Sequence, residues 1–224
     1  MNSSSATLRF NTSGKVNTAP ELTLPLPTQA SRWHASLALR FRQQERGCRL
    51  VSNVHKGPLY VQKPFYPEGH DTAHVYLLHP PGGLVSGDRL GIDIQLEENA
   101  RVLATTPGAG RVYRARGDRC LQQQTQTLRL AAGSVMEWFP QEMIVYPGAY
   151  GRMDTTVDMV AGSTFMGWEI CCLGLPASAQ HFDHGEIRQR LFIRCDGKPR
   201  LLENLSLDAR SFDLFAAAVG MQSC

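Results

Sequence analysis

The stretch LGIDIQLE, residues 90–97, alternates apolar and polar side chains without interruption. Every second residue from Leu90 to Leu96 is leucine or isoleucine, and the residues between them are glycine or polar. Because successive side chains of a β-strand point to opposite faces, this pattern predicts a strand with one face in the core and the other in water.

The same alternation recurs along the chain. Residues 37–41 and 153–159 show it as well. Shorter apolar runs separated by turn residues add candidate strands at residues 59–61, 74–78, 101–106, 125–130, 142–146 and 190–195. Helical periodicity is weak and is found mainly near the end, where Phe212, Phe215 and Val219 share one face. No repeat of fixed length is visible. The chain is therefore predicted to be mainly β with a few helices.

Length and composition restrict the classes of protein that fit. A chain of 224 residues, 42% hydrophobic and 19% charged, is typical of a soluble domain, and its net charge of +3 is too small to favour nucleic-acid binding. No segment approaches the roughly 20 apolar residues of a membrane helix, and the start lacks a secretory signal, so a cytoplasmic protein is expected. Residues 1–30, rich in Ser, Thr, Asn and Pro, are predicted to be a flexible amino-terminal arm before a β-rich domain at 31–224.

The stretch HPPGGLVSGDRL, residues 79–90, has the glycine spacing of a phosphate-binding loop. Asp88 and Arg89 stand where that motif requires Lys and Ser or Thr, and a strand follows where it requires a helix. A carboxylate at the lysine position repels phosphate, so we interpret the stretch as a wide turn that enters a strand. Asp88 itself fits either a buried ion pair or a polar site.

Two histidine pairs, His70 with His74 and His181 with His184, have spacings that place ligands together on a helix. Both pairs fall in turns or at a strand entrance, so structural or surface roles are favoured. His181 and His184 are kept as weak metal candidates because Asp183 lies between them.

Signatures of catalysis are missing from the sequence. It contains no G-x-S-x-G, no H-E-x-x-H and no motif that singles out a cysteine for activation, so no enzyme is predicted. Glu137, Glu142 and Glu169 lie among aromatic and aliphatic residues, where a carboxylate is costly to bury. Each is therefore either on the wet face of its strand or paired or functional inside.

Five segments carry a family resemblance: GPLYVQKPFYPEG (57–69), HVYLLHPPGGLVSGDRL (74–90), ATTPGAGRVYRA (104–115), EWFPQEMIVYPGA (137–149) and FMGWEICCLGLPA (165–177). In this order they resemble the urease accessory protein family UreD, called UreH in some systems, from about Trp33 to Leu207. Ser86 occupies a position where the family commonly has glycine. The chain also stops at Cys224, before the carboxyl-terminal strands that the resemblance implies.

The resemblance implies an elongated, β-helix-like stack of strands and a scaffold or chaperone with no turnover of its own. Such a protein binds the urease apoprotein subunits and recruits UreF and, through it, the GTPase UreG, with UreE as an indirect partner. Nickel then reaches the dinuclear urease site. No tightly bound cofactor is implied, only nickel in transit. The alternative function is a free-standing nickel carrier.

The resemblance also implies an internal passage for nickel. Nickel(II) accepts carboxylate ligands, and a passage must hold the ion weakly enough to release it. The candidates within the matching segments are Asp88, Glu142 and Glu169. The alternative is that these acids form structural pairs with arginines such as Arg89, Arg111 or Arg114.

Overall fold

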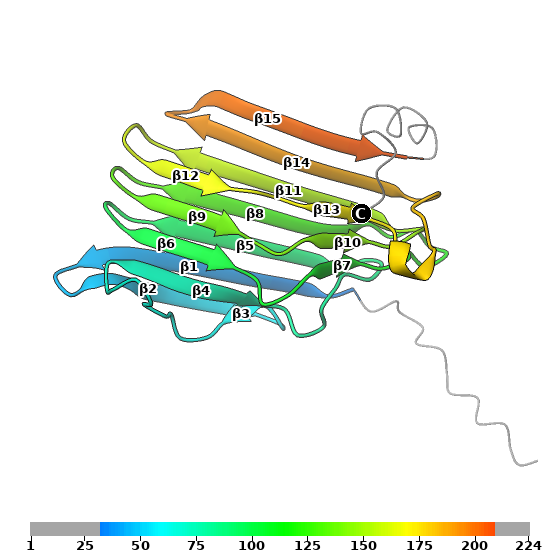
Figure 1. Ribbon diagram of the computed structural model, residues 1–224, viewed down its shortest axis with the longest axis horizontal. Helices are drawn as coiled ribbons and strands as arrows, with labels where there is room; N and C mark the ends of the chain where they lie inside the picture. The colour runs from blue at the N-terminus through cyan, green and yellow to red at the C-terminus, as the bar shows by residue number, and fades with distance from the viewer. Residues whose placement is uncertain (1–31, 209–224) are drawn as a thin grey trace, which may run out of the picture. The chain divides into compact units, whose positions relative to one another are not determined.

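The computed structural model describes residues 32–208, which are β-structure almost throughout (Figure 1). The strands are β1 (His34–Gln44), β2 (Gly47–Lys56), β3 (Tyr60–Val61), β4 (Thr72–Leu78), β5 (Arg89–Leu96), β6 (Arg101–Thr105), β7 (Gly110–Val112), β8 (Gln122–Leu130), β9 (Val135–Phe139), β10 (Met143–Val145), β11 (Tyr150–Met159), β12 (Thr164–Gly167), β13 (Cys171–Leu173), β14 (Glu186–Cys195) and β15 (Lys198–Leu207). The prediction of a mainly β protein is confirmed.

Helix is almost absent from the part of the chain that the structure describes. Within residues 32–208 the helical structure is one 3-10 turn, η1 (Pro176–Ser178), and no helix there is long or apolar enough to span a membrane. Helical periodicity around Phe212 and Val219, and the arm expected at residues 1–30, lie outside the described residues.

The strands form three sheets. The largest has seven strands in the order β15-β14-β11-β8-β5-β1-β2, and its five inner strands run parallel while β2 and β15 are antiparallel to their neighbours. A five-stranded sheet has the order β12-β9-β6-β4-β3, and a three-stranded sheet has the order β13-β10-β7. Buried and exposed residues alternate along β1 and β5, so the large sheet is covered on one face there.

Three consecutive coils build these sheets. The triplets β5-β6-β7, β8-β9-β10 and β11-β12-β13 each visit the seven-, five- and three-stranded sheets in that order, so each strand pairs in parallel with the strand three positions later. Equivalent places in the seven-stranded sheet are taken by Arg89, Gln123, Arg152 and Arg188, which are unequally spaced in the sequence. The unequal connections explain why no fixed-length repeat is visible.

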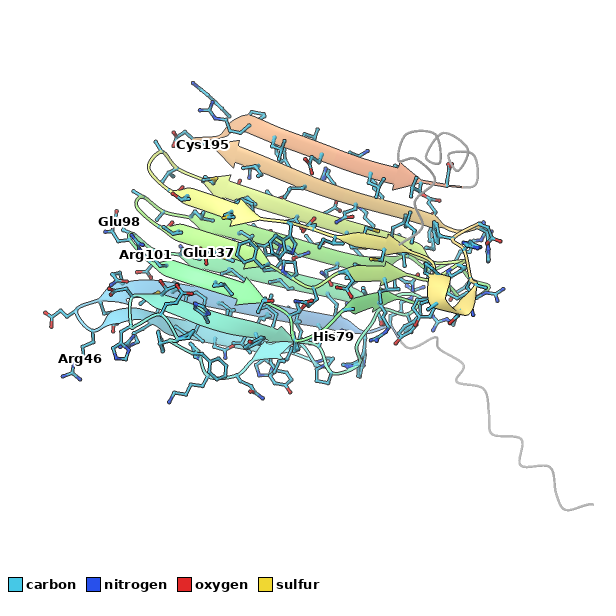
Figure 2. The ribbon with its side chains drawn as sticks, viewed as in Figure 1. Arg46, His79, Glu98, Arg101, Glu137 and Cys195 are labelled. Atoms are coloured by element: carbon cyan, nitrogen blue, oxygen red, sulfur yellow. The ribbon has the colours of Figure 1, made fainter. Side chains whose placement is uncertain are left out.

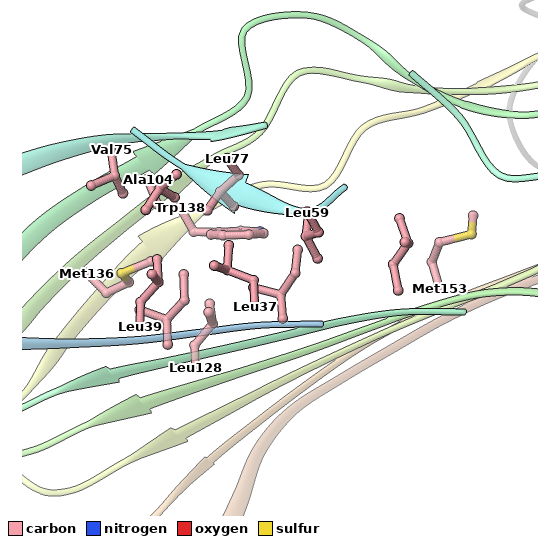
Figure 3. Packing of buried hydrophobic residues seen from close by; sticks show 14 of the residues in the cluster. Leu37, Leu39, Leu59, Val75, Leu77, Ala104, Leu128, Met136, Trp138 and Met153 are labelled. Carbon is pink, nitrogen blue, oxygen red and sulfur yellow. The ribbon is translucent and has the colours of Figure 1, made fainter. Parts of the chain in front are cut away.

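The hydrophobic core lies between the seven-stranded and five-stranded sheets. Figure 3 shows Leu37 and Leu128 of the larger sheet facing Val75, Met136 and Trp138 of the smaller one. All five are essentially inaccessible to water. Each buried side chain of this kind stabilises the fold by about 1.5–3 kcal/mol, so the alternating pattern of the sequence translates directly into this layer.

Candidate functional site

A cavity that is partly open to solvent lies where the five-stranded sheet gives way to the three-stranded sheet. Its volume is about 370 Å³. The seven-stranded sheet supplies one wall, through Leu90, Ile92, Gln124, Gln126, Met153 and Gln189. The opposite wall comes from β3, the end of β4, Trp138 and three connecting loops, at residues 106–109, 140–141 and 169–170. Because the loops of successive coils stack on one another, the cavity runs across the coils.

The walls are mainly apolar, with a few polar groups that face the cavity. Gln126 is only 5% exposed, and no described residue donates a hydrogen bond to its Oε1. A buried amide oxygen without a donor costs about 1–3 kcal/mol, so this atom marks a place where a polar guest is stabilised. Trp138, 1% exposed, closes the cavity on the side of the hydrophobic core.

Glu169 is the acidic group of the cavity wall. It lies in the loop between β12 and β13, where its Oε1 accepts a hydrogen bond from the Thr155 hydroxyl and its Oε2 lies 3.4 Å from the Gln189 Nε2 donor. Thr155 is fully buried on the inner face of β11. Two neighbouring strands of the large sheet therefore hold a carboxylate that comes from the opposite layer.

Burial governs the protonation of this carboxyl. Burial raises the pKa of Glu169, and this effect outweighs the hydrogen bonds from Thr155 and Gln189, which act in the lowering direction. The charge of Glu203 on β15 raises the pKa further. In this place the carboxyl therefore favours its neutral form more than an exposed glutamate does.

The other end of the cavity is lined by His79 and Arg111. Burial lowers the pKa of His79, against a smaller raising effect of the Asp88 charge. Figure 2 shows His79 at the end of the short strands, beside the turn that enters β5. Gly83 is required in this turn, because a Cβ atom there would lie 2.6 Å from Tyr113 Cε2 and 2.8 Å from the Arg111 carbonyl oxygen. The glycine-rich stretch thus packs tightly against β7.

Asp88 is buried, 6% exposed, but it is not among the residues that line the cavity. Its Oδ2 accepts a hydrogen bond from the Val85 N–H at 3.0 Å, and its Oδ1 accepts one from the Trp33 N–H at 3.3 Å. These bonds close the turn before β5 and fasten it to the start of β1. The structure therefore gives this carboxylate structural partners, and its role in nickel passage stays a prediction.

Glu142 also lies away from the cavity wall. It directly precedes β10, and its carbonyl oxygen accepts a hydrogen bond from the Gly110 N–H at 2.9 Å. The neighbouring residues Gln141 and Met143 line the cavity instead. Of the three acids predicted from sequence, the structure brings only Glu169 to the cavity.

The three acids are not paired with arginines in the described part of the chain: no ion pair among residues 32–208 joins Asp88, Glu142 or Glu169 to an arginine. Ser86, found where the family commonly has glycine, is fully buried, and its hydroxyl oxygen accepts a hydrogen bond from the Arg116 N–H at 2.8 Å. The serine thereby anchors the loop that leads from β7 to β8.

The histidine pairs are not assembled into a metal site. His184 Nδ1 lies 2.5 Å from Asp183 Oδ1, and His74 Nε2 lies 3.2 Å from Glu68 Oε1. Within residues 32–208, no three His, Cys, Asp or Glu side chains are grouped so that they could hold one metal ion.

Sequence reasoning missed the polar residues that surround Glu169. Gln126, Thr155 and Gln189 come from β8, β11 and β14 and meet only because those strands are neighbours. One signal was available for β8, where Gln122, Gln124 and Gln126 occupy the alternate positions that continue as Leu128 and Leu130. Glutamines on the inward face of a strand indicate a polar interior.

The chain is similar in sequence to proteins of a known family. Residues 34–224 match the family model described as "UreD urease accessory protein". Proteins named urease accessory protein UreD are similar over most of the chain: the one from Marinomonas sp. (strain MWYL1) is 55% identical over 192 residues, 86% of this chain and 62% of that protein. Those from Pseudomonas entomophila (strain L48) and Klebsiella aerogenes are 45% and 44% identical, over 84% and 81% of this chain and 67% and 66% of their own lengths.

The chain thus spans less than two thirds of the length of the Marinomonas relative. The names of these relatives describe accessory proteins and not enzymes, in agreement with the absence of catalytic motifs in the sequence. The length of the match, the identities above 40% and the order of the matching segments lead to one conclusion: the chain belongs to the UreD family of urease accessory proteins.

Proposed function

We propose that this chain is an accessory protein in urease maturation. It binds the urease apoprotein subunits in the cytoplasm and recruits UreF and, through UreF, the GTPase UreG, while UreE acts indirectly as a further partner. The observation that carries this proposal is the family membership, with relatives named urease accessory proteins at 44–55% identity. A protein with this role works through binding surfaces and has no turnover of its own.

The cavity supports a role for the chain in moving nickel. Nickel(II) is bound by carboxylate oxygens, and the cavity is lined by one carboxylate, Glu169, and by the amides of Gln126 and Gln189, while the Thr155 hydroxyl donates a hydrogen bond to that carboxylate. One charged ligand with neutral neighbours holds the ion weakly, as a passage requires. Nickel is therefore a transient guest, and Asp88 and Glu142 have weaker support as contacts because neither lines the cavity.

The stacked coils supply a suitable frame for such a passage. Each strand of a coil pairs in parallel with its counterpart in the next coil, and this pairing supports the β-helix-like architecture that we propose for the family domain. A cavity that crosses several coils is held open by the hydrogen bonds of all of them.

The alternative function, a free-standing nickel carrier, requires several strong ligands in one place. The described residues contain no such group, and His181 and His184 lie in an exposed turn where His184 is already paired with Asp183. No observation in residues 32–208 favours the carrier.

Two measurements on the same protein test the proposal. Tagged chain is purified from cells that express the urease subunits, UreF and UreG, and from cells that lack them; the accessory role predicts that these proteins co-purify and that urease activity depends on the chain. The isolated chain is titrated with nickel by calorimetry, and weak binding is expected. Tight, stoichiometric nickel binding without any co-purifying urease protein would establish the carrier instead.

A further inference from the structure

The outer face of the seven-stranded sheet carries aligned rows of polar side chains. The apolar residues of β5 and β11 point inward, toward the two smaller sheets, so the residues between them point outward. Every strand of residues 32–208 belongs to one of the three sheets, so no strand of that range covers the outer face. Figure 1 shows β5, β8, β11 and β14 side by side in this sheet.

Four charged residues of β11 and β14 form a square on the outer face. Arg152 is directly opposite Arg188, and the next outward pair is Asp154 with Arg190. Three positive charges thus share one negative charge. Like charges directly opposite each other destabilise a sheet. An anionic group placed beside Arg152 and Arg188 would therefore remove a repulsion that the fold carries when it is alone.

The single carboxylate of the square is already in use. Asp154 is 5% exposed, its Oδ2 accepts a hydrogen bond from Arg152 Nε, and its Oδ1 lies 3.1 Å from Arg190 Nε. Arg188 Nε donates a hydrogen bond to the neutral Asn204 Oδ1 at 3.2 Å. Because the three guanidinium groups are held in place, they lose less entropy when they bind an anion.

Arg89 extends the square along the same row. It pairs with Gln123 of β8, and Gln123 pairs with Arg152, so all three lie on the outer face. Neighbouring strands are about 4.8 Å apart, so the backbone of Arg89 lies about 10 Å from that of Arg152 and about 14 Å from that of Arg188. We call Arg89, Arg152, Arg188 and Arg190 the arginine cluster.

The opposite end of the same face is neutralised. Each outward arginine there has a carboxylate partner: Arg40 and Arg42 with Glu97, Arg129 with Asp93, and Arg194 with Asp158. Among residues 32–208, by contrast, no ion pair joins Arg89 or Arg188 to an acid, and Glu186, two residues before Arg188, makes none either. The excess positive charge is therefore a local property of the arginine cluster.

The shape of the surface indicates a large partner. Beside the arginine cluster the outward residues of β1, β5 and β8 are Ser36, Gly91 and Thr125, which are aligned in register and have short side chains or none. The cluster therefore lies on a flat face, and none of its residues lines the cavity. Guanidinium groups match carboxylates in geometry. Gln123 and Asp154, which lie among the arginines, offer no aromatic ring on which a nucleic-acid base could stack.

We propose that the arginine cluster binds an acidic surface of the urease apoprotein. Urease is the partner that the names of the relatives print, and the inference rests on the proposed accessory function. Carboxylates of the partner lie against Arg89 and Arg188 and relieve the repulsion between Arg188 and Arg152. Charges placed in this way at an interface act mainly on the association rate and on the choice of partner.

Charge reversal in the full chain tests this contact. The test variant combines Arg89→Glu with Arg188→Glu, which leaves the pairs of Asp154 intact. The matched control combines Lys198→Glu with Arg200→Glu, which makes the same change in net charge at exposed positions of β15, where β15 pairs with the end of β14. Binding of purified urease apoprotein is measured by biolayer interferometry at low and high salt, and circular dichroism checks the β-structure of both variants.

The test variant should bind the urease apoprotein several-fold more weakly than the unchanged chain, mainly through slower association, and high salt should reduce the difference. The control should bind like the unchanged chain. Equal binding by all three, equal loss in both variants, or a loss confined to purified UreF or to a DNA duplex would overturn the inference. If the unchanged chain did not bind the urease apoprotein at all, the proposed function would fail with it.

A second variant keeps the positive charges and identifies the partner groups. Arg89→Lys with Arg188→Lys supplies amines that a carbodiimide couples to carboxylates in contact with them. After reaction of this variant with the urease apoprotein, mass spectrometry should find links from position 89 or 188 to Asp or Glu residues of urease. The natural Lys198 serves as the control and should give several-fold fewer links. Equal yields from Lys198, or no link from positions 89 and 188, would also overturn the inference.

Discussion

Replacement of Asp88 tests whether this carboxylate holds the fold or handles the metal. Its two oxygens accept hydrogen bonds from the Val85 and Trp33 N–H groups at 3.0 and 3.3 Å, and the side chain is 6% exposed. A hydrogen bond to a buried charged group contributes about 1.5–3 kcal/mol. The bond to Trp33 is long and lies near an exposed residue, so it counts at the low end.

Asp88→Ala removes both acceptors and should lower the free energy of unfolding by about 3–5 kcal/mol. Asp88→Asn keeps one oxygen for the Val85 N–H and should cost about 1–2 kcal/mol. Urea unfolding followed by tryptophan fluorescence measures both values. The structural assignment is refuted if Asp88→Asn unfolds like the unchanged protein while urease matured with it lacks nickel.

Two further predictions concern the cavity. Burial raises the folded-state pKa of Glu169, so ionisation of this carboxyl destabilises the fold. The destabilisation is absent below the ordinary glutamate pKa of about 4.3 and grows as the pH rises toward the folded-state pKa. Glu169→Gln should therefore be more stable than the unchanged protein at pH 8 and equal to it at about pH 4, and a pH-independent difference in unfolding free energy would contradict this. Gly83→Ala should lower the free energy of unfolding by about 1–3 kcal/mol, because the new Cβ atom would overlap Tyr113 and Arg111. The control is Gly108→Ala, whose Cβ atom would have nothing within 4 Å and whose free energy of unfolding should stay within about 0.5 kcal/mol of the unchanged protein. Equal denaturation midpoints for the two variants would show that the turn around Gly83 can shift to make room.

The strands that sequence predicted best are those with one covered face. β5 and β1 alternate between buried and exposed residues along their length, as the pattern of leucine and isoleucine in LGIDIQLE indicates. β15 lies at the edge of the sheet and is exposed at most positions, so its sequence KPRLLENLSL carries no alternation. The three-residue strands β7 and β13 are too short for any period to show.

The site was only partly accessible to sequence reasoning. Glu169 was identified because a carboxylate among aromatic and aliphatic residues is unusual, yet the same argument selected Glu142, which directly precedes β10 and leaves the cavity wall to Met143. The strand that follows a loop residue sets the direction of its side chain. A strand of three residues such as β10 is too short for that direction to be predicted from sequence. Thr155 and Gln189 meet Glu169 through the stacking of coils with unequal lengths, which local patterns do not encode.

The most direct test of nickel transfer through the cavity is the nickel content of urease matured with Glu169→Gln. The matched control is Glu137→Gln, which makes the same chemical change on β9 at a position that does not line the cavity. Both variants should co-purify with the urease subunits, and nickel per urease active site, measured by mass spectrometry, should fall several-fold with Glu169→Gln and stay unchanged with Glu137→Gln. Full nickel loading with Glu169→Gln would contradict the account.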